Sequence, residues 1–189
     1  MIIKNNTYKG MVNYYIIMAN LKDSPKFAVH NDYYTPKSAW ERINHLIPKD
    51  KVIWEACMLN SNLSKSPEYL SELKNKVIYN VEWDIFKLTA KCDMIITNPP
   101  FETDLKKKVL KRLVEIDKPF IIIMNSMNTF ANYFTKILNP EFIQIITPRG
   151  KINFNKLVDN NKIVETKNCS FYCVYVAYKM NLKNEDLFV

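Results

Sequence analysis

The sequence predicts an α/β fold in which a mostly parallel sheet is flanked by helices and ends in an antiparallel C-terminal hairpin. Three observations lead to this prediction. Short apolar runs alternate with stretches of helical period from residue 36 to residue 146. None of the apolar runs approaches the length of a membrane span. After Pro148, two strand-like runs follow each other with no helix between them, which is typical of antiparallel pairing.

The length and composition are those of one globular domain. The 189 residues can bury a core of their own, and hydrophobic residues at 48% and charged residues at 24% are ordinary globular values. We expect residues 1–30 to form an N-terminal extension and residues 31–189 to form the functional domain. The four cysteines lie in or beside apolar runs without the spacing of metal ligands, so we expect reduced thiols, no metal, and a cytoplasmic protein without membrane association.

The first predicted helix spans residues 36–47. Thr35 can cap its N-terminus, Pro36 suits its first turn, and the apolar residues that follow recur on one face. Strand, helix and strand are then predicted in order at 52–54, from 66 onward, and at 76–81.

The second half of the domain repeats this alternation. A strand at residues 93–97 precedes a helix that Thr103 caps and that reaches Ile116. The remaining elements are predicted as strand, helix, strand and the two hairpin strands, at 119–124, 128–138, 142–146, 162–166 and 170–180. Because strands and helices alternate, we expect helices on both faces of the sheet.

A rigid loop follows the strand at residues 93–97. Its sequence is Asn98-Pro99-Pro100-Phe101. Each proline fixes its own φ and keeps the preceding residue extended, so the loop holds an amide, backbone carbonyls and an aromatic ring in a fixed arrangement. Open α/β sheets bind ligands at such a position, and acceptors beside a flat ring suit a flat substrate with an amino group. Asn-Pro-Pro alone would also suit an ordinary turn.

This loop resembles the catalytic motif of class I S-adenosylmethionine-dependent methyltransferases that modify exocyclic amines, above all the N6 amine of adenine. The resemblance runs from Asp32 to Met180 and implies a Rossmann-like class I methyltransferase fold. It implies that the Asn98 side chain and the Pro99 carbonyl accept hydrogen bonds from the target amine, in a loop that Pro100 helps to hold, and that Phe101 stacks on the base. Acceptors outside the plane of the amine draw its lone pair away from the ring.

The resemblance also implies a binding site for S-adenosylmethionine. The sequence at Tyr33, Thr35 and Pro36 resembles an element that contacts the methionine end of the cofactor in many adenine methyltransferases. Glu55, followed by Ala56, lies where the family has an acidic residue at the end of the first strand. Glu55 would therefore meet the ammonium group of the cofactor.

Further cofactor contacts are implied after the first two strands. Glu82 would bind the ribose, and Asp84 with Ile85 and Phe86 would hold the adenine ring, although Asp84 could equally be a surface loop carboxylate. Asn98 would also contact the cofactor. Residues 57–64 contain no glycine where the family has a glycine-rich turn, and Asn60 or Asn62 could supply the positive φ needed there.

The net charge of +8 favours an anionic partner, with nucleic acid as the first candidate. A cluster from Lys106 to Arg112 follows the rigid loop, although such a cluster can also be a solvated helix face. The segment that holds Arg149 and Lys151 resembles one in short adenine methyltransferases of large DNA viruses and phages. We expect Lys107, Lys108, Arg149 and Lys151 to bind nucleic acid, and a viral protein would act in the host-cell cytoplasm.

Three functions fit these features. The first is methyl transfer to adenine N6 in nucleic acid, DNA before RNA. The second is a degenerate methyltransferase fold that binds nucleic acid or stimulates a partner, as the missing glycine turn allows. The third is a methyltransferase acting on the guanine amine of ribosomal RNA or on protein glutamine. Sequence reading would come from residues 148–168, from a partner subunit, or not at all. The chain could also form a homodimer.

Overall fold

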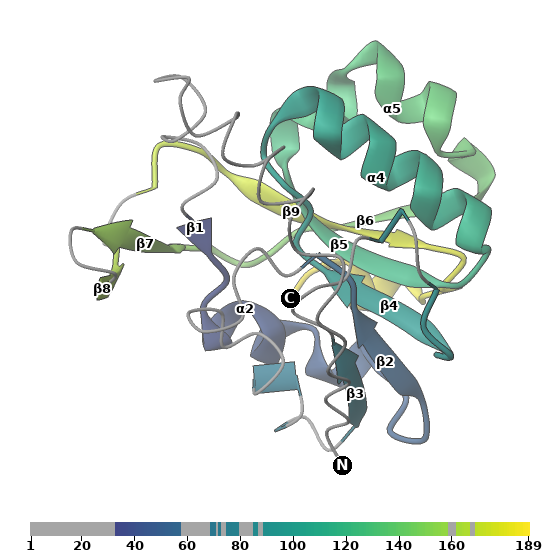
Figure 1. Cartoon of the computed structure of the whole chain (residues 1–189), viewed down its shortest axis with the longest axis horizontal. Coiled ribbons are helices and arrows are strands. Elements are labelled where there is room, and N and C mark those ends of the chain that lie inside the picture. The colour runs from purple at the N-terminus through teal and green to yellow at the C-terminus, as the bar shows by residue number, and fades with distance from the viewer. Residues whose placement is uncertain are drawn as a thin grey trace, which may run out of the picture.

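The computed structural model describes residues 33–57, 69–70, 72, 75–79, 85–86, 89–158, 162–166 and 169–189. Within this part of the chain the main sheet has the strand order β3-β2-β4-β5-β9-β6 (Figure 1). Its strands are, in chain order, β2 (Val52–Glu55), β3 (Lys76–Tyr79), β4 (Met94–Thr97), β5 (Phe120–Asn125), β6 (Ile143–Ile146) and β9 (Cys173–Tyr178). The predicted α/β fold with a mostly parallel sheet is confirmed.

The first four of these strands pair in parallel, and β9 is antiparallel to both β5 and β6. The antiparallel C-terminal end of the sheet is therefore confirmed. The strand predicted at 162–166 does not join it. That strand is β8 (Lys162–Glu165), which pairs with β7 (Asn155–Val158).

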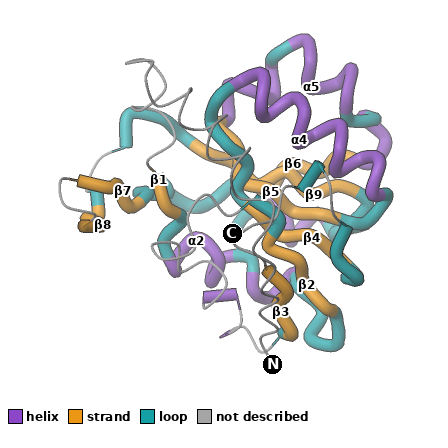
Figure 2. The backbone as a smooth tube through the Cα atoms, in the orientation of Figure 1, coloured by secondary structure: helices purple, strands orange, loops and turns teal. Residues whose placement is uncertain are grey.

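A small second sheet has the order β1-β7-β8 and lies to one side of the main sheet (Figure 2). Its first strand, β1, is Tyr33–Tyr34. The difference between β8 and β9 follows from their side chains. Only a strand that is apolar on both faces can lie between two others in a covered sheet, and β9 is buried along almost its whole length. In β8, Val164 is exposed.

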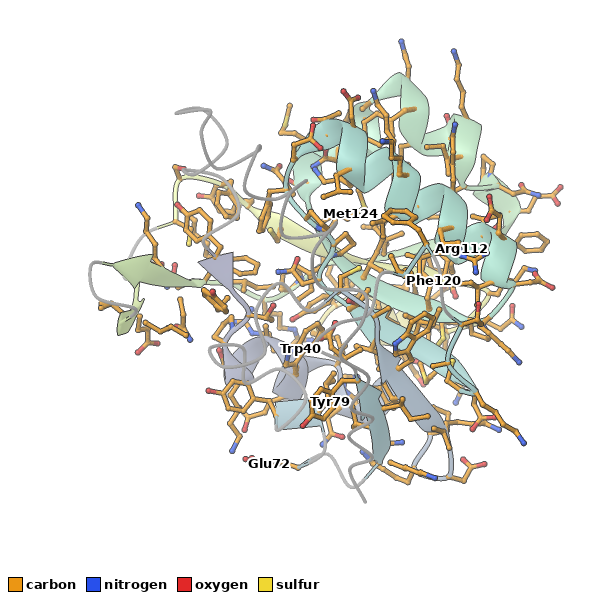
Figure 3. The ribbon with its side chains drawn as sticks, in the orientation of Figure 1. Trp40, Glu72, Tyr79, Arg112, Phe120 and Met124 are labelled. Carbon is orange, nitrogen blue, oxygen red and sulfur yellow. The ribbon has the colours of Figure 1, made fainter. Side chains whose placement is uncertain are left out.

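Helices cover both faces of the main sheet, as Figure 1 shows. On one face lie α2 (Lys37–Arg42) and the short 3-10 helix η1 (Asn44–Leu46). On the other lie α4 (Thr103–Ile116) and α5 (Asn132–Ile137). The alternating residues of β5 enter two separate cores: Ile121 packs with Trp40 of α2, and Phe120 packs beneath α4 (Figure 3). None of the described helices is long and apolar enough to cross a membrane.

Three helix predictions need correction. The helix expected at 36–47 ends at Arg42 and continues as η1, and Pro36 precedes its first turn. Glu102, and not Thr103, caps α4, because its carboxylate accepts hydrogen bonds from the amides of Asp104 and Leu105. The helix expected at 128–138 is divided into η2 (Ser126–Phe130) and α5, because Ala131 between them is extended.

The second predicted helix falls mostly outside the described residues. Tyr69, Leu70 and Glu72 are helical, and Leu70 is fully buried in the core on the α2 side. Glu72 forms an ion pair with Lys37 of α2.

Candidate active site

Several functional side chains meet at the carboxyl edge of the main sheet. The parallel strands β2, β4 and β5 all end there, and the antiparallel strand β9 begins there. The rigid loop after β4 and the residues after β5 therefore face the segment that enters β9. Ligands of open α/β sheets bind at this edge.

Asn98, the first residue after β4, offers a buried hydrogen-bond acceptor. Its Nδ2 donates to Oγ1 of Thr35 at 3.1 Å, and Thr35 is itself buried. Its Oδ1 is buried and has no hydrogen-bond partner among the described residues. A buried polar atom without a partner costs about 1–3 kcal/mol of stability, so this acceptor suits a ligand that brings a donor.

Glu55 and Thr97 join the carboxyl ends of β2 and β4. The Thr97 hydroxyl donates to Glu55 Oε1, and the Cys57 amide donates to Thr97 Oγ1 at 2.9 Å. Burial raises the pKa of Glu55 from 4.5 to about 7, although the hydrogen bonds from Thr97 and Cys57 act in the opposite direction.

No cation forms an ion pair with Glu55 in the part of the chain that the structure describes. Glu55 is a buried carboxyl group at the ligand-binding edge, so an ammonium group of a ligand would suit it well. The side chain present here therefore fits the methionine end of S-adenosylmethionine.

Aromatic side chains form one wall of the site. Phe101 lies 5.7 Å from Phe154 and 5.4 Å from Phe171, measured between ring centroids, and Tyr33 lies 6.0 Å from Phe101. Three of these rings, those of Tyr33, Phe101 and Phe171, line a pocket of about 480 Å³. A pocket of this size with flat apolar walls suits a planar ring.

The polar side of the same pocket contains Lys106, Asn125 and Asn128. Lys106 is 4% exposed, and burial lowers its pKa. Its Nζ donates to the Phe101 carbonyl at 3.0 Å and to Asn128 Oδ1 at 3.2 Å. Lys106 therefore ties the rigid loop to η2 and does not belong to a solvated cluster.

The four basic residues predicted to bind nucleic acid differ in exposure and in their partners. Lys107 is paired with Asp104 at 3.0 Å and lies over the Tyr133 ring, and Lys108 is exposed on α4. Arg149 is exposed after β6, and Lys151 lies over the ring of Tyr172, 4.8 Å from its centroid.

Arg42 of α2 fixes the turn that contains Arg149 and Lys151. Its guanidinium donates to the Gly150 carbonyl at 3.0 Å and to the Lys151 carbonyl at 3.5 Å. Gly150 has a φ of 93°, a conformation that favours glycine.

The structure places the remaining predicted cofactor residues as follows. Tyr33 lines the pocket. Pro36, and not Thr35, is at the N-cap position of α2, and no side chain there forms a capping hydrogen bond. Ala56 and Ile85 are buried in the same apolar cluster beneath α4. Three of the predicted contacts lie outside the described residues: Asn60, Glu82 and Asp84.

Sequence reasoning missed several pocket residues. Asn125 follows an apolar strand just as Asn98 does, so the same signal could have identified it. Phe171 gives no such signal, because its approach to Phe101 depends on the insertion of β9 beside β5. The burial of Lys106 also has no local signature.

The fold of the chain is similar to the folds of solved structures of other proteins. A protein of Pyrococcus horikoshii, provisionally described as an RNA methyltransferase, matches with a TM-score of 0.52 and 17% identity over 88% of this chain and 96% of that one. A protein of Listeria monocytogenes, provisionally described as a class I S-adenosylmethionine-dependent methyltransferase, matches with a TM-score of 0.50 and 12% identity over 92% of this chain and 70% of that one. No protein-family model and no curated protein matches the sequence. These likenesses show that the chain has the Rossmann-like fold of class I methyltransferases.

Proposed function

We propose that the protein transfers a methyl group from S-adenosylmethionine to the N6 amine of adenine in nucleic acid, with DNA as the expected substrate. The observation that carries this proposal is the buried Oδ1 of Asn98, which lacks a partner among the described residues. An exocyclic amine would supply the missing donor. The aromatic wall at Phe101 favours a flat base over a glutamine side chain. RNA is the alternative substrate, and the description of the Pyrococcus protein supports that alternative.

The side chains of the site would act by position and hydrogen bonding. Asn98 Oδ1 accepts one hydrogen of the amine, and the Pro99 carbonyl accepts the other, so that the lone pair of the nitrogen turns away from the ring. Thr35 is a positioning residue, because its hydroxyl holds the amide of Asn98 in this orientation. When bound, S-adenosylmethionine supplies a methyl group on a positively charged sulfur, which keeps the electron pair of the broken bond. The surplus amine proton leaves to solvent.

Glu55 would hold the ammonium group of the cofactor, and its ionised form is the one that binds a cation. Because the pKa of Glu55 is raised to about 7, the affinity should increase as the pH rises through neutrality. Ala56 and Ile85 would supply apolar surface near the cofactor. The roles of Asn60, Glu82 and Asp84 stay predictions from the resemblance.

The second candidate is a degenerate module that binds nucleic acid without using the cofactor. It is favoured by the glycine-free segment 57–64 and by the Cys57 amide, which donates to Thr97. In the related fold, free amides after the first strand approach the ligand.

Calorimetric titration with S-adenosylhomocysteine separates these two candidates. We expect the wild-type protein to bind more tightly at pH 8 than at pH 6, by roughly tenfold. The Glu55→Gln variant should bind weakly at both pH values. Wild-type protein that shows no heat of binding at millimolar ligand would favour the degenerate module. Equal affinities of the two proteins would instead remove Glu55 from the cofactor site.

A methyl-transfer assay then identifies the substrate. The probes are oligonucleotides that carry one adenine or one guanine among thymines in DNA or among uracils in RNA, together with a glutamine-containing peptide. We expect transfer of labelled methyl only to the strands with adenine. Transfer to the guanine strand or to the peptide would replace the proposed substrate by the corresponding alternative.

A further inference from the structure

Large apolar side chains are exposed beside the pocket. Of the seven exposed residues of this kind in the described part of the chain, three lie at the carboxyl edge: Met127 at 70%, Phe130 at 80% and Tyr172 at 66% exposure. Met127 lines the pocket itself. The Ser126 amide donates to the Tyr172 carbonyl at 2.9 Å, so η2 and the segment before β9 are held together. Exposed apolar groups that gather at one place mark an interaction surface.

Positive charge accompanies these side chains. Lys151 lies over the Tyr172 ring and has no ion-pair partner among the described residues, and the exposed Arg149 is two residues away. A flat ring beside an unpaired ammonium group suits a partner that offers both aromatic faces and negative charge.

A second pair of a lysine and an aromatic ring, elsewhere in the molecule, shows how such a pair looks when a carboxylate neutralises the lysine. At the opposite edge of the sheet Lys179 lies over the Phe142 ring, 5.1 Å from its centroid. There, Asp117 forms an ion pair with Lys179, and Tyr178 packs against Phe142 at 5.7 Å between ring centroids. Among the described residues, the pair at Tyr172 has no such carboxylate.

We propose that Met127, Phe130 and Tyr172 form a stacking platform for the bases that flank the target in single-stranded nucleic acid, with Lys151 and Arg149 at the phosphates. The platform rests on the proposed function, because the pocket beside it is the one assigned to the target base. A single strand offers the faces of its bases for stacking, whereas a duplex offers only base edges and phosphates. The occupant is therefore an unpaired strand, and the target base needs no extraction from a duplex.

Binding of fluorescently labelled oligonucleotides, measured by anisotropy without cofactor, tests the platform. Three probes are compared: a mixed-sequence single strand, its duplex, and a strand with the same phosphates whose bases next to one adenine are replaced by abasic spacers. We expect wild-type protein to prefer the complete single strand over the other two. Tyr172→Ala should weaken binding of that strand by roughly tenfold and reduce the preference over the abasic strand by the same factor, as expected for one lost stacking contact.

Phe142→Ala is the matched control, because it removes an exposed ring that also carries a lysine. It should bind all three probes as the wild-type protein does. Tyr172→Phe keeps the ring and should retain the preference. Tighter binding of the duplex by the wild-type protein, or equal effects of Tyr172→Ala and Phe142→Ala, would overturn the platform.

The experiments can contradict the proposed function and the platform independently of each other. A protein that shows the strand preference but methylates no adenine retains the platform and loses the catalytic assignment. A protein that methylates adenine while Tyr172→Ala binds normally retains the assignment and loses the platform.

Discussion

At each edge of the main sheet an asparagine has a buried Oδ1 without a partner among the described residues: Asn98 after β4 and Asn75 before β3. At the amino edge, the Asn75 Nδ2 donates to two backbone carbonyls, those of Pro48 at 2.8 Å and Lys51 at 3.0 Å. Asn75 thus stabilises the loop that precedes β2. At the carboxyl edge, Asn98 donates only to the hydroxyl of Thr35 among the described residues. The loop that contains Asn98 is already held by its two prolines.

Carboxylates link β2 and β4 at both edges as well. Asp93 is exposed and accepts from the Val52 amide at 2.7 Å, whereas Glu55 is buried and accepts from Thr97. The same residue types therefore serve stability at the amino edge and remain available for a ligand at the carboxyl edge. The role of a polar side chain therefore depends more on whether it lies at the amino or the carboxyl ends of the parallel strands than on its residue type.

The largest expected effect is on catalysis. Asn98→Ala should lower the rate of methyl transfer by about a hundredfold or more, because a hydrogen bond to the reacting amine is lost. Asn75→Ala, its counterpart at the amino edge, should lower the melting temperature and leave the rate per folded molecule unchanged. Single-turnover rates and thermal unfolding of both variants test this contrast. Near-normal turnover of Asn98→Ala would mean that Asn98, like Asn75, has a structural role and no catalytic one.

The next effect concerns stability and pH. The pKa of Glu55 is raised from 4.5 to about 7 in the folded protein, so the unfolded chain releases this proton at lower pH than the folded protein does. The contribution of Glu55 to stability is therefore complete below about pH 4.5 and is lost as the pH rises to about 7, by on the order of 3 kcal/mol. Glu55→Gln should remove this part of the pH dependence.

Urea unfolding at a series of pH values measures how the free energy of unfolding depends on the titration of Glu55. Asp93→Asn at the amino edge is the control, and it should keep the slope that Glu55 causes. A wild-type stability that does not fall between pH 5 and pH 7 relative to Glu55→Gln would show that Glu55 titrates normally.

The smallest effect is on salt dependence. Arg149→Gln and Lys151→Gln should each reduce the slope of log affinity against log salt by about 0.7 on single-stranded nucleic acid, if each contacts one phosphate. Lys107→Gln should change the slope less, because Asp104 already neutralises Lys107. Anisotropy titrations between low and moderate salt give these slopes. An equal reduction in all three variants would show that the carboxyl edge and α4 form one uniform basic surface.

Much of the fold could be predicted because alternating apolar and amphipathic segments are local patterns. The strands β2, β4 and β5 and the helix α4 follow directly from them, and the rigid loop could be recognised from its two prolines. The pairing of β8 with β7 could not be predicted, since it depends on which strand can be buried on both faces. Lys106 looks like its neighbours in the sequence, and only the packing of α4 against η2 makes it a buried donor.

The insertion of β9 between β5 and β6 has a consequence for how the chain acquires its site. Among the described strands β6 pairs only with β9, and β9 pairs with β5 across a long separation in sequence. During synthesis, the rigid loop at Asn98 can therefore form well before Phe171 arrives to complete the aromatic wall. Such distant pairings form late in folding. A competent pocket consequently appears only once the C-terminal strand has been inserted, which makes ligand binding a reporter of complete folding.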